Sequence, residues 1–273
     1  MGLAPLWRLR SRASQVEIAP GEATPGKEPP QAGADASCAQ ASSPMPAPQF
    51  GDHGARDAST QRIEPSPRPA LGDASPDERE RTARIADMDW DALESDIRAC
   101  EACALCRQRK QAVPGVGDRQ ADWMFVGEGP GAEEDRRGEP FVGPAGKLLD
   151  AMLAAIGLQR DQDVYIANAV KCRPPHNRTP EADEIAACHP YLGRQIQLVS
   201  PKLLIALGRP AAQALLGTEI KINAARGKIF DRAGIPVIVT YHPAYLLRNP
   251  ADKAKAWEDL CFARAVAAGA VSS

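Results

Sequence analysis

Short apolar runs separated by longer amphipathic stretches recur along the chain from about residue 90 onward. The runs WMFVG, VYIANAV, KLLIALG and PVIVTY are apolar on both faces, which is typical of strands buried within a parallel sheet. Helical spacing of apolar residues appears in stretches such as PAGKLLDAMLAAIGL, which has Pro144 in its first turn. This alternation predicts the fold class α/β: a three-layer α/β/α sandwich around a central, mostly parallel sheet.

Further helices are predicted at residues 89–100, 179–199, 209–217 and 249–268. In the second of these, Thr179 is the predicted N-cap and Pro180 the first helical residue. The segment GKIFDRAGIPVIVTYHP predicts a hairpin that leads into the last strand. In a sheet of this kind, functional groups are expected on loops at the carboxyl ends of the strands.

The first part of the chain lacks this periodicity. Residues 1–89 hold 12 of the 25 Pro, and their apolar residues are isolated. Such a segment cannot bury enough surface to offset its ordering entropy, so we expect a disordered Pro/Ala/Gly-rich tail over residues 1–88 and one α/β domain over residues 89–273. Residues 1–15 contain Arg but no Asp or Glu, a composition that organellar transit peptides share. We nevertheless prefer to interpret this segment as part of a disordered extension.

The charge excludes one class of protein. A formal net charge of −2 is incompatible with a globally basic nucleic-acid binder. Residues 90–273 carry 23 basic and 22 acidic side chains, so binding to a polyanion would depend on local clusters such as KCRPPHNR and YLLRNP. No apolar run reaches the ~18–20 residues that a membrane-spanning helix needs.

The chain has seven cysteines, and the odd number, without an export signal, argues against a disulfide scaffold. Five of them fall at spacings typical of metal ligands: Cys100, Cys103, Cys106, Cys172 and Cys188. Two cysteines that are close in the sequence, together with two distant ones, could provide four thiolates for one metal site. Such a site could hold either zinc or an iron–sulfur cluster, and the spacing does not decide between them. His176 and His189 are further candidates for a zinc site. Cys38 lies in the tail, and Cys261 is expected to be a buried structural thiol of the last helix.

The segment VGEGPGAEED follows a predicted strand, and its Gly127, Gly129 and Ala132 satisfy the dinucleotide pattern G-x-G-x-x-[GA]. That pattern requires a helix to begin at once, whereas acids follow here and Gly138 interrupts any helix. We therefore interpret the segment as a tight turn whose amides approach a neutral planar ligand. Phe141 is available to stack on that ligand, and the alternative is that it belongs to the core.

Two polar side chains fall near the carboxyl ends of other predicted strands. Asn168 lies within VYIANAV, where its carboxamide either satisfies local backbone or presents a donor and an acceptor to a ligand. His242 follows PVIVTY and is either structural or a ligand-binding group.

Together these stretches resemble the family-four uracil-DNA glycosylases, the iron–sulfur branch of the uracil-DNA glycosylase superfamily. The resemblance rests on CEACAL, VGEGPGAEED, GEPFVGPAGKLLD, YIANAVKCRPPHNRTP, EIAACHPYL and HPAYLLRNP, which occur in the family's order. It implies an enzyme of DNA repair that hydrolyses the N-glycosidic bond of deoxyuridine in DNA, releasing uracil. It also implies a structural 4Fe–4S cluster held by Cys100, Cys103, Cys172 and Cys188, with Cys106 as an extra thiol.

The resemblance further implies a pocket for a uracil that has been flipped out of the DNA stack. Uracil would lie against Phe141, with the Asn168 amide reading O4 and N3–H. The backbone of the Gly-rich turn would line the rest of its edge: Gly127, Glu128 and Gly129.

Catalysis is assigned by the same resemblance to two side chains. His242 would donate a hydrogen bond to O2 of the departing uracil anion. Glu128 would orient water or balance sugar charge, with Glu134 and Asp135 as the alternatives.

Contacts with DNA are implied for residues around these loops. Leu246 and Leu247 would fill the vacated base stack. The implied phosphate contacts are Lys147, Lys171, Arg173, Arg178 and Arg248.

A related branch carries a nucleophilic His in an inserted KRRIH loop and becomes covalently trapped on DNA. This chain has KCRPPHNRTP, with His176 near that place but without the insertion, so we expect turnover. The alternatives are a non-catalytic or covalently trapped uracil-DNA binding module, and a zinc-stabilised nucleotide-binding protein. We expect a cytoplasmic, nucleoid-associated monomer of bacterial type, with uracil-containing DNA as its partner and no membrane contact.

Overall fold

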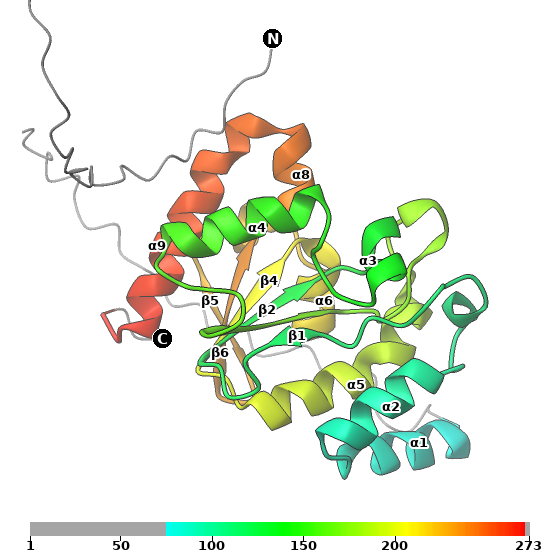
Figure 1. Ribbon diagram of the computed structural model, residues 1–273. Coiled ribbons are helices and arrows are strands. Elements are labelled where there is room, and N and C mark those ends of the chain that lie inside the picture. The colour runs from blue at the N-terminus through cyan, green and yellow to red at the C-terminus, as the bar shows by residue number, and fades with distance from the viewer. Residues whose placement is uncertain (1–74, 271–273) are drawn as a thin grey trace, which may run out of the picture. The chain divides into compact units, whose positions relative to one another are not determined.

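A computed structural model describes residues 75–270, so most of the tail predicted over residues 1–88 lies outside the described residues. Six strands form one sheet in the order β1-β3-β2-β4-β6-β5 (Figure 1). The four inner strands pair in parallel: β2 (Trp123–Gly127), β3 (Val164–Asn168), β4 (Leu203–Leu207) and β6 (Ile235–Thr240). The edge strands β1 (Val116–Gly117) and β5 (Ile229–Arg232) pair antiparallel. The mostly parallel sheet and the hairpin before the last strand are therefore confirmed.

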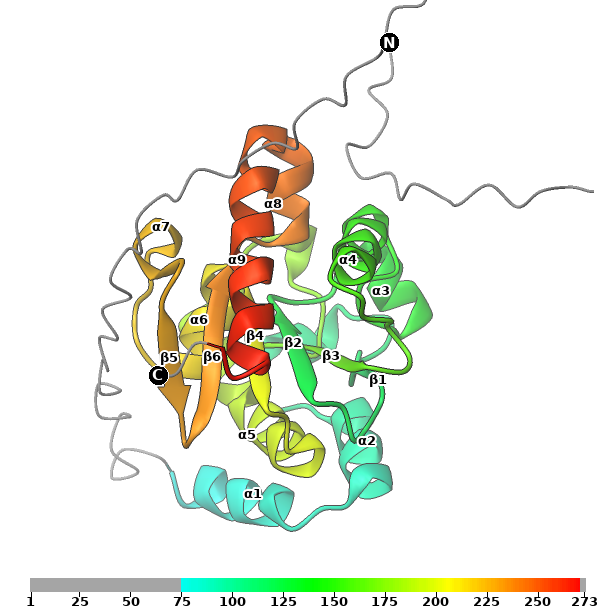
Figure 2. The ribbon, with the colours of Figure 1, turned by 90° about the vertical axis from the view of Figure 1, so that its left-hand side faces the viewer.

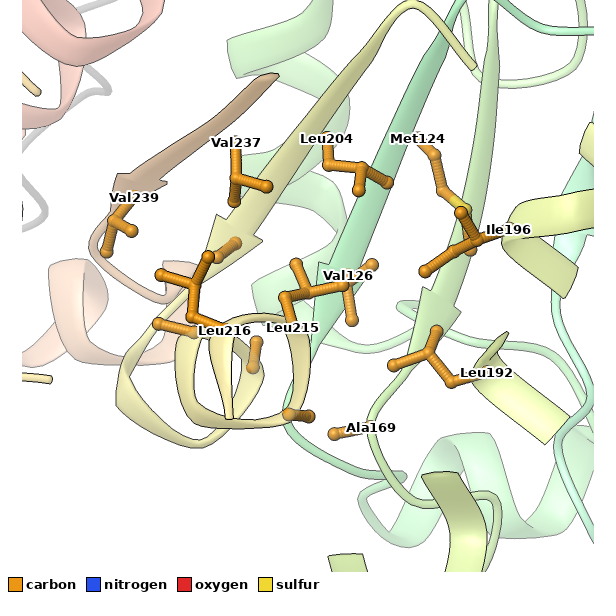
Figure 3. Close-up of a cluster of buried hydrophobic side chains, with 14 of the residues drawn as sticks. Met124, Val126, Ala169, Leu192, Ile196, Leu204, Leu215, Leu216, Val237 and Val239 are labelled. Atoms are coloured by element: carbon orange, nitrogen blue, oxygen red, sulfur yellow. The ribbon is translucent and has the colours of Figure 1, made fainter. Parts of the chain in front are cut away.

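Helices cover both faces of the sheet, which explains why its strands are apolar on both sides. The first face packs against α5 (Ala182–Val199), α6 (Arg209–Leu216) and the short α7 (Ile222–Ala225). Figure 3 shows this cluster, in which Met124 and Val126 of β2 meet Leu192 and Ile196 of α5.

The second face packs against α4 (Pro144–Ala155), α8 (Pro243–Arg248) and α9 (Lys253–Ala267). In Figure 2, α9 crosses in front of the sheet. Because side chains alternate along a strand, Trp123 and Phe125 of β2 belong to this second cluster. Three layers follow, as the alternation of elements predicts. Among residues 75–270, no helix combines the length and apolar character needed to cross a membrane.

The folded part begins earlier than the sequence predicts. Helix α1 (Pro76–Ala86) lies within the predicted tail, and its capping box joins Ser75 to Glu78. Its Ile85 is fully buried and packs with Leu93 of α2 (Trp90–Ala99) and Tyr191 of α5. The predicted boundary at residue 88 is wrong, because a helix with a single buried apolar residue leaves almost no periodic signal.

Three local predictions are also wrong. Helix α5 begins at Ala182, with a capping box between Glu181 and Glu184, rather than after Thr179. A short helix, α3 (Ala132–Arg137), does begin directly after the Gly-rich turn and ends where Gly138 adopts φ 78°. Cys261 on α9 is exposed rather than buried.

Candidate active site and cysteine cavity

The ends of four strands meet at the carboxyl edge of the sheet. Gly127 ends β2 and is paired in register with Asn168, which ends β3. His242 lies two residues beyond the end of β6, and Gly208 follows β4. A Cβ at Gly208 would lie 3.1 Å from the Cβ of His242, so the absence of a side chain there lets the His242 loop approach. The sheet topology therefore brings together the strand-end residues that the sequence singles out.

Asn168 presents an unpaired polar atom at this edge. Its side chain is 2% exposed, and its Oδ1 is the one buried side-chain nitrogen or oxygen of residues 75–270 that has no hydrogen-bond partner. A Cβ at Gly127 would lie 2.4 Å from this Oδ1 and 2.6 Å from Cζ of Phe141. Buried polar groups are almost always hydrogen-bonded, so this acceptor indicates a site for a donor that belongs to a ligand.

Phe141 is held in a backbone conformation that few side chains adopt, with φ 56°. Arg160 donates to the carbonyl oxygens of Pro140 at 3.0 Å and Phe141 at 2.9 Å, and it forms an ion pair with Asp150 at 2.7 Å. A Cβ at Gly146 would lie 1.7 Å from the Phe141 oxygen, so this close approach of loop and helix requires glycine. The ring of Phe141 is thus fixed by its own backbone, and Arg160 is a supporting residue without any local sequence signal.

His242 is the N-cap of α8, where its Nδ1 accepts a hydrogen bond from the Ala244 amide at 3.1 Å. This bond assigns the proton to Nε2, which is left as a donor. Burial, helped by the charge of Arg248 and opposed by that of Glu134, lowers the pKa of His242 to about 4. The imidazole is therefore neutral near pH 7 and can donate one N–H without carrying a charge.

Glu128 lies in the Gly-rich turn and is half-buried. Burial raises its pKa, while Thr179, Arg209 and Arg248 act in the opposite direction. The carboxyl group is thus partly desolvated, and it feels the charges of Arg209 at the start of α6 and Arg248 at the end of α8.

The alternative carboxylates are committed to the fold. Glu134 accepts hydrogen bonds from the amides of Gly131, Val142 and Gly143 and so ties the turn to the Phe141 loop. Asp135 is 1% exposed and accepts from the Lys110 amide at 2.8 Å. Both carboxylates are engaged by backbone amides, so Glu128 is the most available of the three to contact a ligand or water.

Two of the predicted DNA contacts are contradicted by burial. Lys171 is 1% exposed, and its Nζ donates to the Asn168 carbonyl oxygen and to Gln195 Oε1 instead of facing solvent. Leu246 is 1% exposed and packs in the second core cluster, whereas Leu247 is 42% exposed. Adjacent residues of a helix point about 100° apart, so α8 buries Leu246 and exposes Leu247, and the two consecutive leucines do not reveal in the sequence which one is buried.

The other predicted phosphate contacts reach the surface to different degrees. Lys147 and Arg248 are exposed. Arg173 donates to Asn177 at 2.7 Å, and Arg178 forms ion pairs with Glu184 at 2.7 Å and Glu181 at 3.3 Å. Arg178 therefore has carboxylate partners of its own, and the least engaged cations are Lys147 and Arg248.

A cavity lies between α2, α5 and the loop after β3. Its lining includes all five cysteines with metal-ligand spacing: Cys100, Cys103, Cys106, Cys172 and Cys188. Its remaining lining residues are Ile97, Ala102, Lys171, Ala187 and Tyr191. Neither histidine considered for a zinc site belongs to this lining.

Cations surround the thiols of this cavity. Arg109 donates to Cys172 Sγ at 2.9 Å, and Arg81 of α1 donates to Cys100 Sγ at 3.7 Å. Burial raises the pKa of Cys188 to about 12, so this thiol would stay protonated unless a metal and positive charges stabilise its thiolate. Within residues 75–270 no three His, Cys, Asp or Glu side chains are close enough to hold one metal ion. In a four-iron cluster each thiolate binds a different iron, so the donors stand farther apart, and the thiols that line this cavity are donors of the kind that such a cluster needs.

Comparison with known proteins agrees with this arrangement. Residues 114–261 match the model of the family described as the uracil DNA glycosylase superfamily. The chain is 46% identical to the type-4 uracil-DNA glycosylase of Pyrobaculum aerophilum, over 63% of this chain and 92% of the relative. It is 48% identical to the type-4 enzyme of Sulfurisphaera tokodaii, over 58% of this chain and 76% of the relative. It is 45% identical to the type-4 uracil-DNA glycosylase of Archaeoglobus fulgidus, over 59% of this chain and 84% of the relative.

Proposed function

This chain belongs to the uracil-DNA glycosylase superfamily, in its type-4 group, and on that premise we propose that it hydrolyses the N-glycosidic bond of deoxyuridine in DNA, leaving an abasic site. The family is one of DNA-repair enzymes. The proposal assigns the reaction to the carboxyl edge of the sheet, where the Gly-rich turn, Asn168, Phe141 and His242 meet.

The observation that carries the proposal is the unpaired Oδ1 of Asn168. An amide oxygen only accepts hydrogen bonds, so its partner must be a donor. Uracil offers N3–H to this oxygen and O4 to the adjacent amide nitrogen. Cytosine reverses both groups, with an acceptor at N3 and an amino group at C4, so it would leave the buried amide unsatisfied. A site built around such a hydrogen bond discriminates by several orders of magnitude.

Base binding and bond cleavage are assigned to the two rings. Uracil stacks on Phe141, whose ring lies close to the Asn168 amide because Gly127 has no side chain to hold the two apart. Cleavage gives an oxocarbenium-like sugar and a uracil anion whose charge develops on O2. The neutral His242 then donates its Nε2–H to this oxygen, and that bond strengthens as the charge grows.

The attacking water needs a group that orients it. We assign this role to Glu128, because Glu134 and Asp135 are bound to backbone amides. As a carboxylate it accepts a hydrogen bond from water and stabilises the positive sugar.

The DNA duplex would lie over the loops that carry these groups. Leu247 is an exposed apolar side chain of α8, the helix that His242 caps, and it fills the gap left by the flipped base. Lys147, Arg173 and Arg248 provide the cations for phosphate contacts.

The cysteine cavity would hold a 4Fe–4S cluster on Cys100, Cys103, Cys172 and Cys188. When bound, the cluster supplies cross-links between α2, the loop after β3 and α5, without taking part in hydrolysis. The cations Arg81 and Arg109 balance the negative charge of the thiolates.

Incubation with a uracil-containing oligonucleotide followed by alkali tests the proposal. Release of free uracil and an alkali-labile break at the uracil position are expected. Binding without either product would favour a non-catalytic module of this fold. A protein–DNA adduct stable to denaturation would favour covalent trapping.

A further inference from the structure

Lys171 is a fully buried lysine whose ammonium group has two partners, neither of them charged. Its Nζ donates to the Asn168 carbonyl oxygen at 2.8 Å and to Gln195 Oε1 at 2.6 Å. No carboxylate forms an ion pair with it in the part of the chain that the structure describes. Burying an ammonium group is costly unless hydrogen bonds satisfy it, and here one of its two bonds goes to the carbonyl oxygen of Asn168.

The second partner is itself firmly placed. Gln195 of α5 is 0% exposed and donates through Nε2 to the Pro114 oxygen at 2.8 Å and toward Tyr165 Oη at 3.3 Å. The backbone of Lys171 is also fixed, because its oxygen accepts from the Val113 amide at 2.8 Å. The ammonium group is therefore held at both ends of its side chain.

The first partner belongs to the residue that reads the base. Asn168 is the last residue of β3, and its carbonyl group marks the point where the chain leaves the sheet. The next amide, of Ala169, donates to the Gly127 oxygen at 2.9 Å. A donor on the Asn168 carbonyl thus fixes the peptide plane that connects the base-reading residue to the loop.

We propose that Lys171 is a positioning residue for base recognition: its ammonium group, anchored by Gln195, orients the Asn168 backbone so that the unpaired amide oxygen faces the base. Lys171 also lines the cysteine cavity, so the same side chain lies between the thiols and the base-reading residue. This inference rests on the proposed function, since it concerns how that site selects uracil.

The experiment measures binding, so that it does not depend on turnover. Iron-loaded protein is titrated with duplex DNA that contains 2′-fluoro-deoxyuridine, which resists cleavage, and with the same duplex containing thymidine. Lys171→Met removes both hydrogen bonds while nearly conserving volume. We expect it to lose about tenfold of the preference for the uracil analogue. Lys202→Met is the matched control, because Lys202 is exposed at the opposite end of the sheet and pairs with Asp122.

A second pair of variants separates positioning from stability and decides the matter if Lys171→Met does not fold. Gln195→Met removes the anchor of the ammonium group, whereas Gln195→Glu keeps an oxygen acceptor for it. Both lose the bond to the Pro114 oxygen and are expected to lower the melting temperature. Only Gln195→Met is expected to lose the preference for uracil.

The outcomes distinguish two failures. If the wild-type protein shows no preference for the uracil analogue, the proposed function is overturned and this inference with it. If the wild type shows the preference, and Lys171→Met or Gln195→Met keeps it in full, the inference alone is overturned.

Discussion

The Phe141 and His242 rings lie with their centroids 5.4 Å apart and their planes inclined by 29°. They come from loops that follow different strands, and each is fixed by backbone: Phe141 through Arg160, and His242 through the Ala244 amide. We infer that the Phe141 ring, on which the base stacks, and the His242 ring, which donates a hydrogen bond to the base, are preorganised together.

Replacing Asn168 by alanine tests base reading. Uracil excision is expected to fall by about two to three orders of magnitude, because the donor and acceptor for O4 and N3–H are lost. The melting temperature is expected to change little, since Oδ1 has no partner to lose within the protein. Single-turnover assays and thermal unfolding measure the two effects. A large loss of stability would mean that the amide serves the fold.

Replacing His242 by alanine tests the donor to O2. The single-turnover rate is expected to fall by about 10²–10³, the usual effect of losing a donor to a developing anion. Affinity for uncleavable uracil-containing DNA should stay within a few-fold, because the bond is strongest in the transition state. An unchanged rate would refute this role.

The pH dependence of the reaction should reflect the protonation of Glu128. Burial raises the pKa of this carboxyl group, so its active carboxylate form is lost at a higher pH than for an ordinary glutamate. Activity is therefore expected to fall as the pH drops toward this raised pKa. His242, with a pKa of about 4, stays neutral and should add no step between about pH 5 and 8. In Glu128→Gln the acidic limb should disappear from a lowered profile; an acidic limb that persists would assign it to another group.

The adjacent leucines of α8 form a matched pair. Leu246→Ala should destabilise the fold by about 2–5 kcal/mol, because this side chain is buried in the core. Leu247→Ala should leave stability nearly unchanged and reduce activity on double-stranded more than on single-stranded DNA, because base flipping from a duplex needs the wedge. Thermal unfolding and parallel assays on both substrates check the pair, and equal losses on both substrates would exclude a wedge.

The cysteine cavity can be tested by iron content and by absorbance near ~400 nm. Cys172→Ser is expected to lose iron and unfold at a lower temperature. Cys106→Ser is expected to keep its iron, since the resemblance leaves this thiol outside the ligand set although it lines the same cavity. Loss of iron in Cys106→Ser would revise the ligand set.

The inner strands and the three layers could be predicted because burial on both faces leaves an unbroken apolar run such as WMFVG. Helix α1 could not, because it is polar apart from Ile85 and gains its stability from α2 and α5. Propensity and period describe a segment alone, whereas α1 depends on surfaces that exist only in the folded protein.

Some residues of the candidate site could likewise be predicted from the sequence, and others could not. Gly127, Asn168 and His242 could be expected at one edge because each lies at or just beyond the carboxyl end of a parallel strand. The burial of Lys171 could not, since it depends on Gln195 of α5, 24 positions later in the chain. Arg160 likewise carries no signal in its own segment, and only its bonds to the Phe141 loop reveal its place.

The positively charged side chains next to the cysteine cavity limit how this protein could be redesigned. An engineer who replaced the four proposed ligand cysteines with apolar residues, to obtain an oxygen-tolerant version, would leave Arg81, Arg109 and Lys171 facing a cavity without anions. Repulsion among the three and their loss of solvation would offset the gain from packing. A metal-free version would therefore need new carboxylates near the first two cations, and it would have to leave the lysine beside Asn168 untouched.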